Sequence, residues 1–464
     1  MTHILPIFLL LAAIAVVLAR LPKVDLGHSD AFKKRRVMNW LPLGLTYAFL
    51  YFGRYNLSAI VDLLEKQSLM TKAQFGEIDA VGAYVYGIAF LINGPLTDRW
   101  GGRVTILIAA FGSAVMNVGM ALAISGGGDL KTQLLFLNAA NMYFQSFGAV
   151  SIVKVNAPWF HVRERGVLGG LFGILISLGL YFSYDWSLLL AKNVGFTSVF
   201  VVPAIVLSLC FVIALLVIRD SPAAAGFANF DTGDASSGQT EHLSPLTVAK
   251  RMFSQRVIWI IVAIEFCSGF LRQAVMKWFR PYARAIGDAD GFVYQNWGML
   301  LCIAGIMGGV FAGFISDHVF GSRRGPVASV LYGGMLLGAI AAAFLIGSPQ
   351  IGWAVIFMSL CVIGVHGMLS GTASMDFGGT KNAGIVTGII DGFVYLGTGT
   401  QALLYGNILP KDAAAKEAAN WQSWPMAMLP VAVVGFGLCL LVWNARPQKH
   451  TSPAATPAPQ KLSA

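Results

Sequence analysis

Charged residues are scarce in this chain of 464 residues: Asp, Glu, Lys and Arg make up 12% of it, against 56% hydrophobic residues. Soluble globular domains carry about 25% charged residues, so the composition excludes an ordinary soluble protein. Long apolar runs recur from one end to the other and predict an all-α protein that crosses the lipid bilayer many times. The net charge of +10 is then expected in cytoplasmic loops rather than on a nucleic-acid-binding surface.

The sequence also lacks the patterns of a catalytic or metal-binding site. Its five cysteines lie singly in apolar segments without a CxxC pair, which is typical of buried structural thiols rather than metal ligands or disulfides. It contains no nucleophile motif, no metal-ligand cluster and no glycine-rich phosphate loop. We therefore expect no enzymatic activity, no catalytic residue, no metal and no cofactor.

The apolar segments divide the chain into two halves. After a short segment, Ile4–Ala19, twelve longer ones lie near 39–60, 76–97, 104–125, 132–155, 166–184, 197–218, 256–279, 292–316, 326–346, 351–374, 383–408 and 424–444. A stretch rich in Gly, Ser, Ala and Asp separates the sixth from the seventh and predicts a flexible linker. We therefore expect an extra N-terminal helix with a basic linker (1–36), a six-helix bundle (37–218), a cytoplasmic central loop (219–250), a second six-helix bundle (251–445) and a disordered cytoplasmic tail (446–464).

Basic residues predict the orientation of the chain in the membrane. They precede the first long span and then mark every second loop, including the central one. The positive-inside rule places these loops and the C-terminus in the cytoplasm, and we expect a bacterial inner membrane. Ile4–Ala19 lacks a basic region before it, which argues against a cleaved signal peptide. An additional spanning helix is the interpretation we favour, and an interfacial helix is the alternative.

The two halves repeat each other at a fixed offset. Three pairs of residues, each 218 or 219 positions apart, occur in similar surroundings: Arg54 and Arg272, Asp98 and Asp317, and Gly166 and Gly384. A shared offset of this kind predicts a parallel duplication of a six-helix unit. The expected fold is therefore two six-helix bundles related by a pseudo-twofold axis.

A loop motif, GPLTDRWGGR, lies between the second and third long spans and has a counterpart in GFISDHVFGSRRG. Its glycine allows two helices to approach closely, and its charged residues form contacts at a face that must open and close. We assign a gating role to Gly94, Asp98, Arg99, Arg103, Asp317 and Arg323. With this motif in both halves, the chain resembles the major facilitator superfamily over all twelve long spans.

Two arginines, Arg54 and Arg272, stand inside apolar spans at matching places in the two halves. An arginine within the membrane costs roughly 2.5–3.5 kcal/mol even on insertion scales, and it does not escape that cost by losing its proton. A guanidinium offers paired donors that fit two oxygens of a phosphate. We therefore predict that these two side chains clamp one anion near the pseudo-twofold axis.

Other polar residues follow helical spacing within the spans. Tyr47, Tyr51 and Tyr55 share a face with Arg54, which favours a cavity wall. Asn141 and Gln145 form a stripe in the fourth span, and Tyr395 lies in one in the eleventh; for such stripes, packing between helices is an alternative role. Lys277 reaches the cavity only if its helix is broken, and otherwise its ammonium group lies at the membrane interface. We include these seven residues in the predicted substrate site.

Three titratable residues in the second half are candidates for coupling or ion pairing. Glu265 lies two turns from Arg272 and is either its counter-ion or a proton carrier. Asp391 is a buried carboxylate in its span, so it needs a partner. His366 is either a proton group or a hydrogen-bonded core histidine.

Four segments, YFGRYNLSA, NAPWFHVRERG, FLRQAVMKW and TKNAGIVTGIIDGFVYLG, resemble the organophosphate:phosphate antiporter family. The resemblance implies that Arg54 and Arg272 bind substrate phosphate, and that an organic phosphate ester is exchanged for inorganic phosphate. Tyr55, Phe90 and Ile176 depart from it, because the glycerol-phosphate branch has a lysine, a lysine and a histidine at these positions. A larger phosphorylated solute, or another organic anion, is therefore favoured over glycerol phosphate.

Two other functions are compatible with the sequence. One is a proton-coupled symporter of an organic anion, with Glu265, Asp391 or His366 as the proton site. The other is a transporter-like sensor of a sugar phosphate, since the family that the chain resembles includes such members. In each case we expect a monomer that binds a small anion within the bilayer and no nucleic acid.

Overall fold

The computed structural model describes residues 27–161, 174–232, 246–247, 250, 253–254, 256–315, 319–320, 324–367, 369 and 373–444. Within these ranges the secondary structure is helical, without strands. Four predictions fall wholly or partly outside them: the extra helix Ile4–Ala19, the loop residues Asp317 and Arg323, residues 233–245 and 248–249 of the central loop, and the tail 446–464.

The described residues form twelve long helical segments in the order that the apolar pattern predicts. The first six are α2 (Asp30–Lys66), α3 (Lys72–Trp100), α4 (Gly102–Gly126), α5 (Leu130–Asn156), Ile174–Asn193 and α8 (Ser198–Val217). The last six are α10 (Arg256–Ala285), α12 (Trp297–Phe314), α13 (Arg324–Phe344), α14 (Ile351–His366), α15 (Ala373–Ile408) and α16 (Ser423–Leu441).

The structure departs locally from two of the predicted spans. The fifth described segment, Ile174–Asn193, continues past the predicted end at 184 through η3 (Phe182–Trp186), a π-helical turn, and α7 (Ser187–Asn193). The predicted span 292–316 is divided into α11 (Phe292–Gln295) and α12. The division occurs at Asn296, whose backbone is not helical, so the first amide groups of α12 have no partner within the helix itself.

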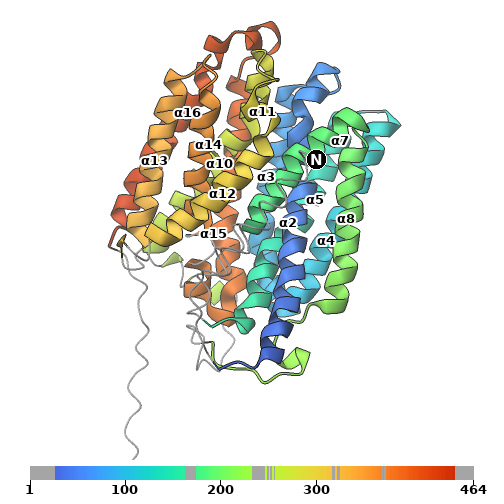
Figure 1. Cartoon of the computed structure of the whole chain (residues 1–464), viewed down its shortest axis with the longest axis vertical. Helices are drawn as coiled ribbons and strands as arrows, with labels where there is room; N and C mark the ends of the chain where they lie inside the picture. Colours follow the sequence, from blue (N-terminus) through green and yellow to red (C-terminus); the bar gives the residue numbers. More distant parts are fainter. Residues whose placement is uncertain are drawn as a thin grey trace, which may run out of the picture.

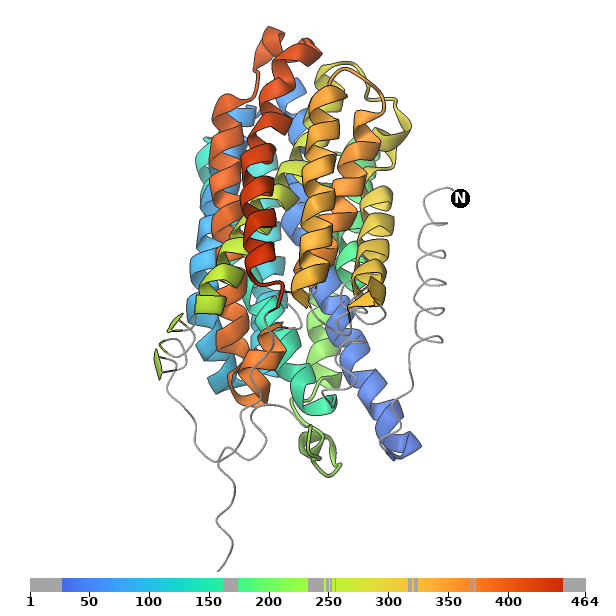
Figure 2. The ribbon, with the colours of Figure 1, turned by 90° about the vertical axis from the view of Figure 1, so that its left-hand side faces the viewer.

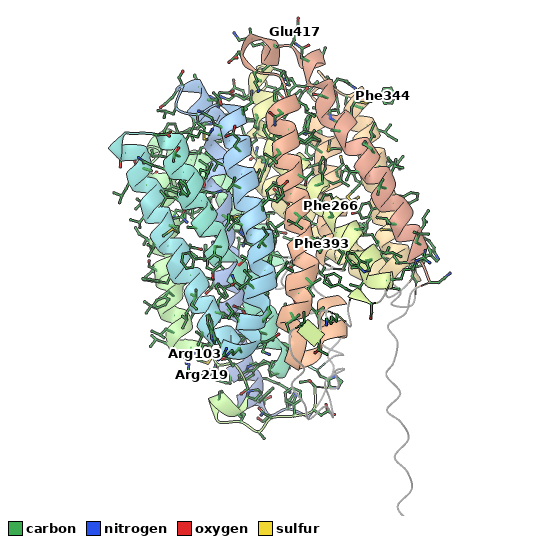
Figure 3. The ribbon with its side chains drawn as sticks, turned by 180° about the vertical axis from the view of Figure 1, so that it is seen from behind. Arg103, Arg219, Phe266, Phe344, Phe393 and Glu417 are labelled. Carbon is green, nitrogen blue, oxygen red and sulfur yellow. The ribbon has the colours of Figure 1, made fainter. Side chains whose placement is uncertain are left out.

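The helices form two bundles that stand side by side (Figure 1), with the N-terminal half in blue to green and the C-terminal half in yellow to red. The view turned by 90° shows the helices running along the long axis of the molecule (Figure 2). Arg103 and Arg219 lie at the lower end of the N-terminal bundle (Figure 3). We call this end the basic-loop face, and the other end, where Glu417 lies, the opposite face.

Seven of the described helices are long and apolar enough to cross a membrane, and α8 is the most apolar with a mean hydropathy of 3.0. Neither α2 nor α5 is among those seven. Polar residues interrupt the apolar sequence of these two helices and are buried inside the protein, including Arg54, Asn56, Asn141 and Gln145. Buried polar residues therefore lower the hydropathy of α2 and α5, whereas α10 carries buried charges and is still among the seven.

Glycines bring the two bundles into contact along α3 and α15. A Cβ atom on Gly94 would come within 2.5 Å of the carbonyl oxygen of Gly384, and Gly87 faces Gly392 in the same way at 2.8 Å. Near the opposite face, Gly76 meets Gly406. These contacts require residues without a side chain, because helix backbones approach this closely only where no Cβ intervenes.

Candidate anion site between the two bundles

Arg54 lies on α2 in the middle of the molecule and is 4% exposed. Its Nε donates to Oε1 of Gln145 at 2.8 Å, and its Nη1 donates to the hydroxyl of Tyr395 at 2.8 Å. Its guanidinium carbon stands 4.4 Å from the ring centroid of Tyr51 and 4.7 Å from that of Tyr86. These partners are neutral, and Nη2 has no hydrogen-bond partner among the described residues.

Arg272 supplies the matching guanidinium from the C-terminal bundle, on α10, and is also 4% exposed. Its guanidinium carbon lies 5.7 Å from the ring centroid of Tyr395. Within the described part of the chain, neither its Nε nor its Nη2 has a hydrogen-bond partner. A buried cation with two free donors is costly, so the structure offers an anion both charge and hydrogen bonds at this position.

Tyr395 on α15 connects the two arginines, because its hydroxyl accepts from Arg54 and its ring lies beside Arg272. Tyr86 on α3 packs against it, with ring centroids 3.9 Å apart, and Phe90 lies 5.8 Å from it. Tyr47, one turn from Tyr51, contacts that ring edge-on at 5.4 Å rather than reaching either arginine. The arginines therefore lie among aromatic side chains from both bundles.

The side chain of Asn141 is held by hydrogen bonds within the N-terminal bundle. Its amide donates to the carbonyl oxygen of Gly53 at 2.9 Å, and Asn117 on α4 donates to the same oxygen at 3.1 Å. The side-chain oxygen of Asn141 accepts from Gln145 at 3.4 Å. Asn141 thus holds the backbone beside Arg54 and orients Gln145, the residue that binds its guanidinium.

Lys277 reaches the interior, next to the predicted substrate site. Its ammonium group forms an ion pair with Asp79 on α3, across the boundary between the bundles. The ammonium nitrogen also lies 5.4 Å from the ring of Tyr55, whose hydroxyl accepts from Gln273 at 2.9 Å. α10 is helical over Arg256–Ala285, so a side-chain partner on α3, rather than a break in the helix, brings Lys277 inward.

Replacing Asp79 with asparagine is expected to destabilise the protein, because Lys277 is 3% exposed and would become an uncompensated buried charge. Removing one member of such a pair typically costs about 3–5 kcal/mol. The apparent melting temperature of the purified protein in detergent measures the loss. The double variant Asp79→Asn, Lys277→Gln should recover most of it, and a double variant as unstable as the single one would contradict the pairing.

Contacts between the bundles close the opposite face. The hydroxyl of Tyr294 donates to Oδ2 of Asp62 at 2.5 Å, and Arg284 lies 3.3 Å from the same oxygen. Nearer the centre, Nη1 of Arg280 donates to the backbone carbonyl of Tyr184 at 3.2 Å. The carboxylate of Asp185 accepts from two amides at the start of α12, at 2.7 and 2.8 Å. Each contact joins the N-terminal half to the C-terminal half.

A second set of contacts joins the bundles at the basic-loop face. Asp98, at the end of α3, pairs with Lys154 at 2.7 Å and accepts from the backbone amide of Ile385 on α15 at 3.2 Å. Arg103 instead binds within its own bundle, donating to the carbonyl of Leu215 at 2.7 Å. Arg99 is exposed. Arg54 and Arg272 therefore lie between two sets of contacts that join the bundles, one set nearer each face.

The loop after α8 is held by Asp220, which accepts from the backbone amide of Arg103 at 2.8 Å. Burial raises the pKa of this carboxyl above its usual range, and the hydrogen bond from Arg103 offsets part of that shift. Arg103 therefore binds the end of α8 with its side chain and the following loop with its amide.

Glu265 is fully buried and lies 3.4 Å from Nδ1 of His366, on α14. Asp391 and Arg272 also interact with it electrostatically. Asp391 is itself buried, at 6% exposed. The three candidates for coupling thus lie in one region of the C-terminal bundle, beside Arg272, rather than apart.

Several residues of the site were absent from the set chosen from the sequence: Asp79, Tyr86, Tyr184 and Gln273. Asp79 carried a usable signal, because it is a carboxylate inside an apolar span and such residues require a partner. The two tyrosines and the glutamine carried none, since uncharged polar residues at helical spacing usually pack between helices.

Comparison with known proteins is decisive for the family. The model of the Major Facilitator Superfamily matches residues 43–401. The chain belongs to the major facilitator superfamily. The predicted fold class is confirmed, and a family of transporters is in keeping with the prediction that the protein is not an enzyme. A solved bacterial homologue of the human lysosomal transporter Spinster, in an inward-facing and unoccupied conformation, shares the fold with a TM-score of 0.68 at 14% identity, covering 89% of this chain and 97% of its own.

Three relatives of this superfamily member cover nearly its whole length. The glycerol-3-phosphate transporter of Bacillus subtilis (strain 168) is 24% identical over 90% of this chain and 95% of its own. The probable hexose phosphate transport protein of Chlamydia pneumoniae is 24% identical over 91% and 94%. The membrane sensor protein UhpC of Salmonella typhimurium is 23% identical over 89% and 93%. These similarities confirm the resemblance to the organophosphate:phosphate antiporter family.

Proposed function

We propose that this protein exchanges an organic phosphate ester for inorganic phosphate by alternating access, with Arg54 and Arg272 binding the phosphoryl group. The observation that carries the proposal is the pair of buried guanidiniums, one from each bundle, with free donors. Among the described residues, Nε and Nη2 of Arg272 and Nη2 of Arg54 have no hydrogen-bond partner. A phosphate oxygen satisfies such donors and compensates the two charges at once.

The position of the arginines at the boundary of the bundles supports alternating access. An anion bound to both side chains ties the two halves together, while each face is closed by its own set of contacts. Opening the opposite face breaks the contacts of Asp62 and Arg280, and opening the basic-loop face breaks that of Asp98 with Ile385. One bound anion near the centre is then reached from either face in turn.

Charge supports exchange rather than one-way transport. Two cations in a medium of low dielectric repel each other when no anion lies between them, and the hydrogen-bond partners of Arg54 are neutral. The empty protein therefore reorients slowly, and the loaded one reorients readily. A transporter with this property carries an anion in each direction.

The relatives and the aromatic residues support a phosphorylated substrate with a sizeable body. The named relatives act on glycerol 3-phosphate and, as a probable function, hexose phosphate. Phe90, where the glycerol-phosphate branch carries a lysine, packs edge-on against Tyr86 at 4.7 Å and contributes an apolar ring instead of a charge. Such a surface suits the carbon skeleton of a larger ester.

Counterflow in proteoliposomes tests the proposal. Vesicles loaded with unlabelled phosphate should take up labelled phosphate, and vesicles without internal anion should take up little. Unlabelled phosphate esters in the external solution should compete, and the strongest competitor indicates the substrate. Uptake into anion-free vesicles at the same rate would contradict exchange. Uptake that requires a pH gradient would favour proton coupling instead, with Glu265 and His366 as the proton site.

A sensor is the second candidate, favoured by the similarity to a membrane sensor protein. It predicts that phosphate esters bind and raise the melting temperature of the purified protein while no flux occurs in vesicles. We further propose that the protein acts as a monomer in a bacterial inner membrane, with its C-terminus in the cytoplasm. Cysteine labelling from either side of the membrane tests that orientation.

A further inference from the structure

A series of buried polar groups continues from the central arginines toward the opposite face. Three cations lie on one face of α10, at positions 277, 280 and 284, which helical spacing brings into line. Lys277 pairs with Asp79, and Arg284 pairs with Asp62. Arg280, between them, contacts a backbone carbonyl and an aromatic ring, and these contacts do not neutralise it.

Arg280 is 3% exposed and, among the described residues, retains two donors without a partner. One nitrogen, Nη1, donates to the carbonyl oxygen of Tyr184, and the guanidinium carbon lies 4.7 Å from the ring centroid of Tyr294. In the ranges that the structure describes, its Nε and Nη2 have no hydrogen-bond partner. These are the same two nitrogens that are free on Arg272.

Tyr184 supplies a further buried polar group near these two arginines. The ring of Tyr184 stacks on that of Tyr55, with centroids 6.4 Å apart and planes at 14°. Both Arg272 and Arg280 interact with the hydroxyl electrostatically. Although this hydroxyl is buried, no described residue forms a hydrogen bond with it. Tyr184 therefore adds a hydroxyl without a described partner to the free donors of Arg272 and Arg280.

Compensation of Asp185 is an alternative role for Arg280, since the two groups interact electrostatically. The two oxygens of Asp185, however, already accept from the amides of Gly298 and Met299 at the start of α12. A carboxylate at a helix N-terminus is stabilised there by the amides and the helix dipole. Asp185 thus leaves the free donors of Arg280 unsatisfied.

We propose that Arg280 and Tyr184 form a second anion subsite, and that the substrate is a phosphate ester with a second anionic group, a carboxylate or a second phosphoryl group. This inference rests on the proposed function, because it assigns the first phosphoryl group to Arg54 and Arg272. Arg272 and Arg280 are eight residues apart, which is roughly 12 Å along the helix axis. A single molecule that binds both arginines at once therefore needs acidic groups at its two ends.

Matched competitors test the subsite in the full-length protein. Phosphoglycerate and glycerol phosphate share a three-carbon body and differ in the carboxylate, and hexose bisphosphate differs from hexose monophosphate in a second phosphoryl group. We expect the wild type to prefer the doubly anionic member of at least one pair by roughly tenfold or more, the effect of a charge-assisted hydrogen bond. The two pairs distinguish a carboxylate from a phosphoryl group.

Two variants locate the preference. Arg280→Gln should lower the ratio of the two inhibition constants to near one, and Tyr184→Phe should lower it by a smaller factor. Tyr184→Phe removes one free hydroxyl and preserves the ring, so it keeps the test valid if Arg280→Gln fails to fold. Arg256→Gln, at an exposed position at the start of α10, is the matched control and should keep the ratio.

The outcome separates this inference from the proposed function. If the wild type exchanges phosphate but both members of each pair inhibit that exchange equally, the subsite is overturned and the exchange proposal stays intact. A ratio that neither Arg280→Gln nor Tyr184→Phe changes overturns it as well. If phosphate exchange is absent, the exchange proposal fails, and the same ratio is then measured as ligand-induced stabilisation of the protein in detergent.

Discussion

Replacing Arg272 with alanine is expected to reduce phosphate exchange by about 100-fold or more. Its guanidinium is buried, and two of its donors have no partner among the described residues. Each hydrogen bond to a charged group contributes about 1.5–3 kcal/mol. Losing two such bonds corresponds to roughly 3 kcal/mol at the least, or about 100-fold in binding. Initial rates of labelled phosphate uptake into phosphate-loaded vesicles measure the loss, and Arg54→Ala should behave in the same way.

The controls for this result separate charge from geometry. Arg272→Lys keeps the charge and loses the planar fork, so it should retain part of the activity. Arg256→Ala removes an exposed arginine from the same helix and should leave uptake near the wild-type rate. An Arg272→Ala protein that is folded and exchanges phosphate within a few-fold of the wild type would rule out the clamp.

Replacing Gly269 with alanine is expected to destabilise the protein markedly. A Cβ atom at this position on α10 would lie 1.9 Å from the carbonyl oxygen of Val394 on α15, so one helix must move. Overpacking in a tight core typically costs about 1–3 kcal/mol, and a backbone atom, unlike a side chain, does not rotate away. We expect the apparent melting temperature in detergent to fall by roughly 1–4 °C.

Gly309 on α12 provides a matched control. Its Cβ position has no atom within 4 Å, so Gly309→Ala should be neutral or slightly stabilising, by about 0.5–1 kcal/mol from helix propensity alone. The two variants add the same methyl group to a helical glycine in the same bundle. Equal melting temperatures for them would contradict the close approach of α10 and α15.

The arrangement of helices was largely predictable because the bilayer restricts the choices. Backbone polar groups in lipid must be satisfied within a segment, so each apolar run of sufficient length becomes a helix. The twelve described segments follow the twelve predicted runs in order. The boundaries were less predictable: Asn296 divides one run, and the fifth described segment reaches Asn193 through a π-helical turn that hydropathy does not indicate.

The candidate site was predictable where a single residue would be energetically costly to bury without a partner. Arg54 and Arg272 were evident because a guanidinium in an apolar span requires an anionic or polar partner. Tyr51 and Tyr55 followed from Arg54 through helical spacing, and the structure brings their rings within 4.4 and 5.9 Å of its guanidinium carbon. These inferences depend on one helix at a time.

Partners across helices were beyond such reasoning. Helical periodicity allowed the side chain of Lys277 to point either into the cavity or toward the membrane interface. Its actual direction depends on Asp79, which is 198 residues away in the sequence. Asn141 was chosen as a site residue, and only the packing of α5 on α2 shows that its amide holds the carbonyl of Gly53. Both outcomes depend on which helices are neighbours.

The sequence by itself therefore determined that the protein is a duplicated bundle of membrane helices with a guanidinium from each half in its interior. These features were predictable because the cost of burying a side chain and its helical periodicity depend only on the residue and its near neighbours in the sequence. The tertiary structure decided which of the buried charges are paired. It satisfies Lys277 and Arg284 with carboxylates and leaves donors of Arg272 and Arg280 free among the described residues, because charge compensation depends on distances of a few ångströms between separate helices.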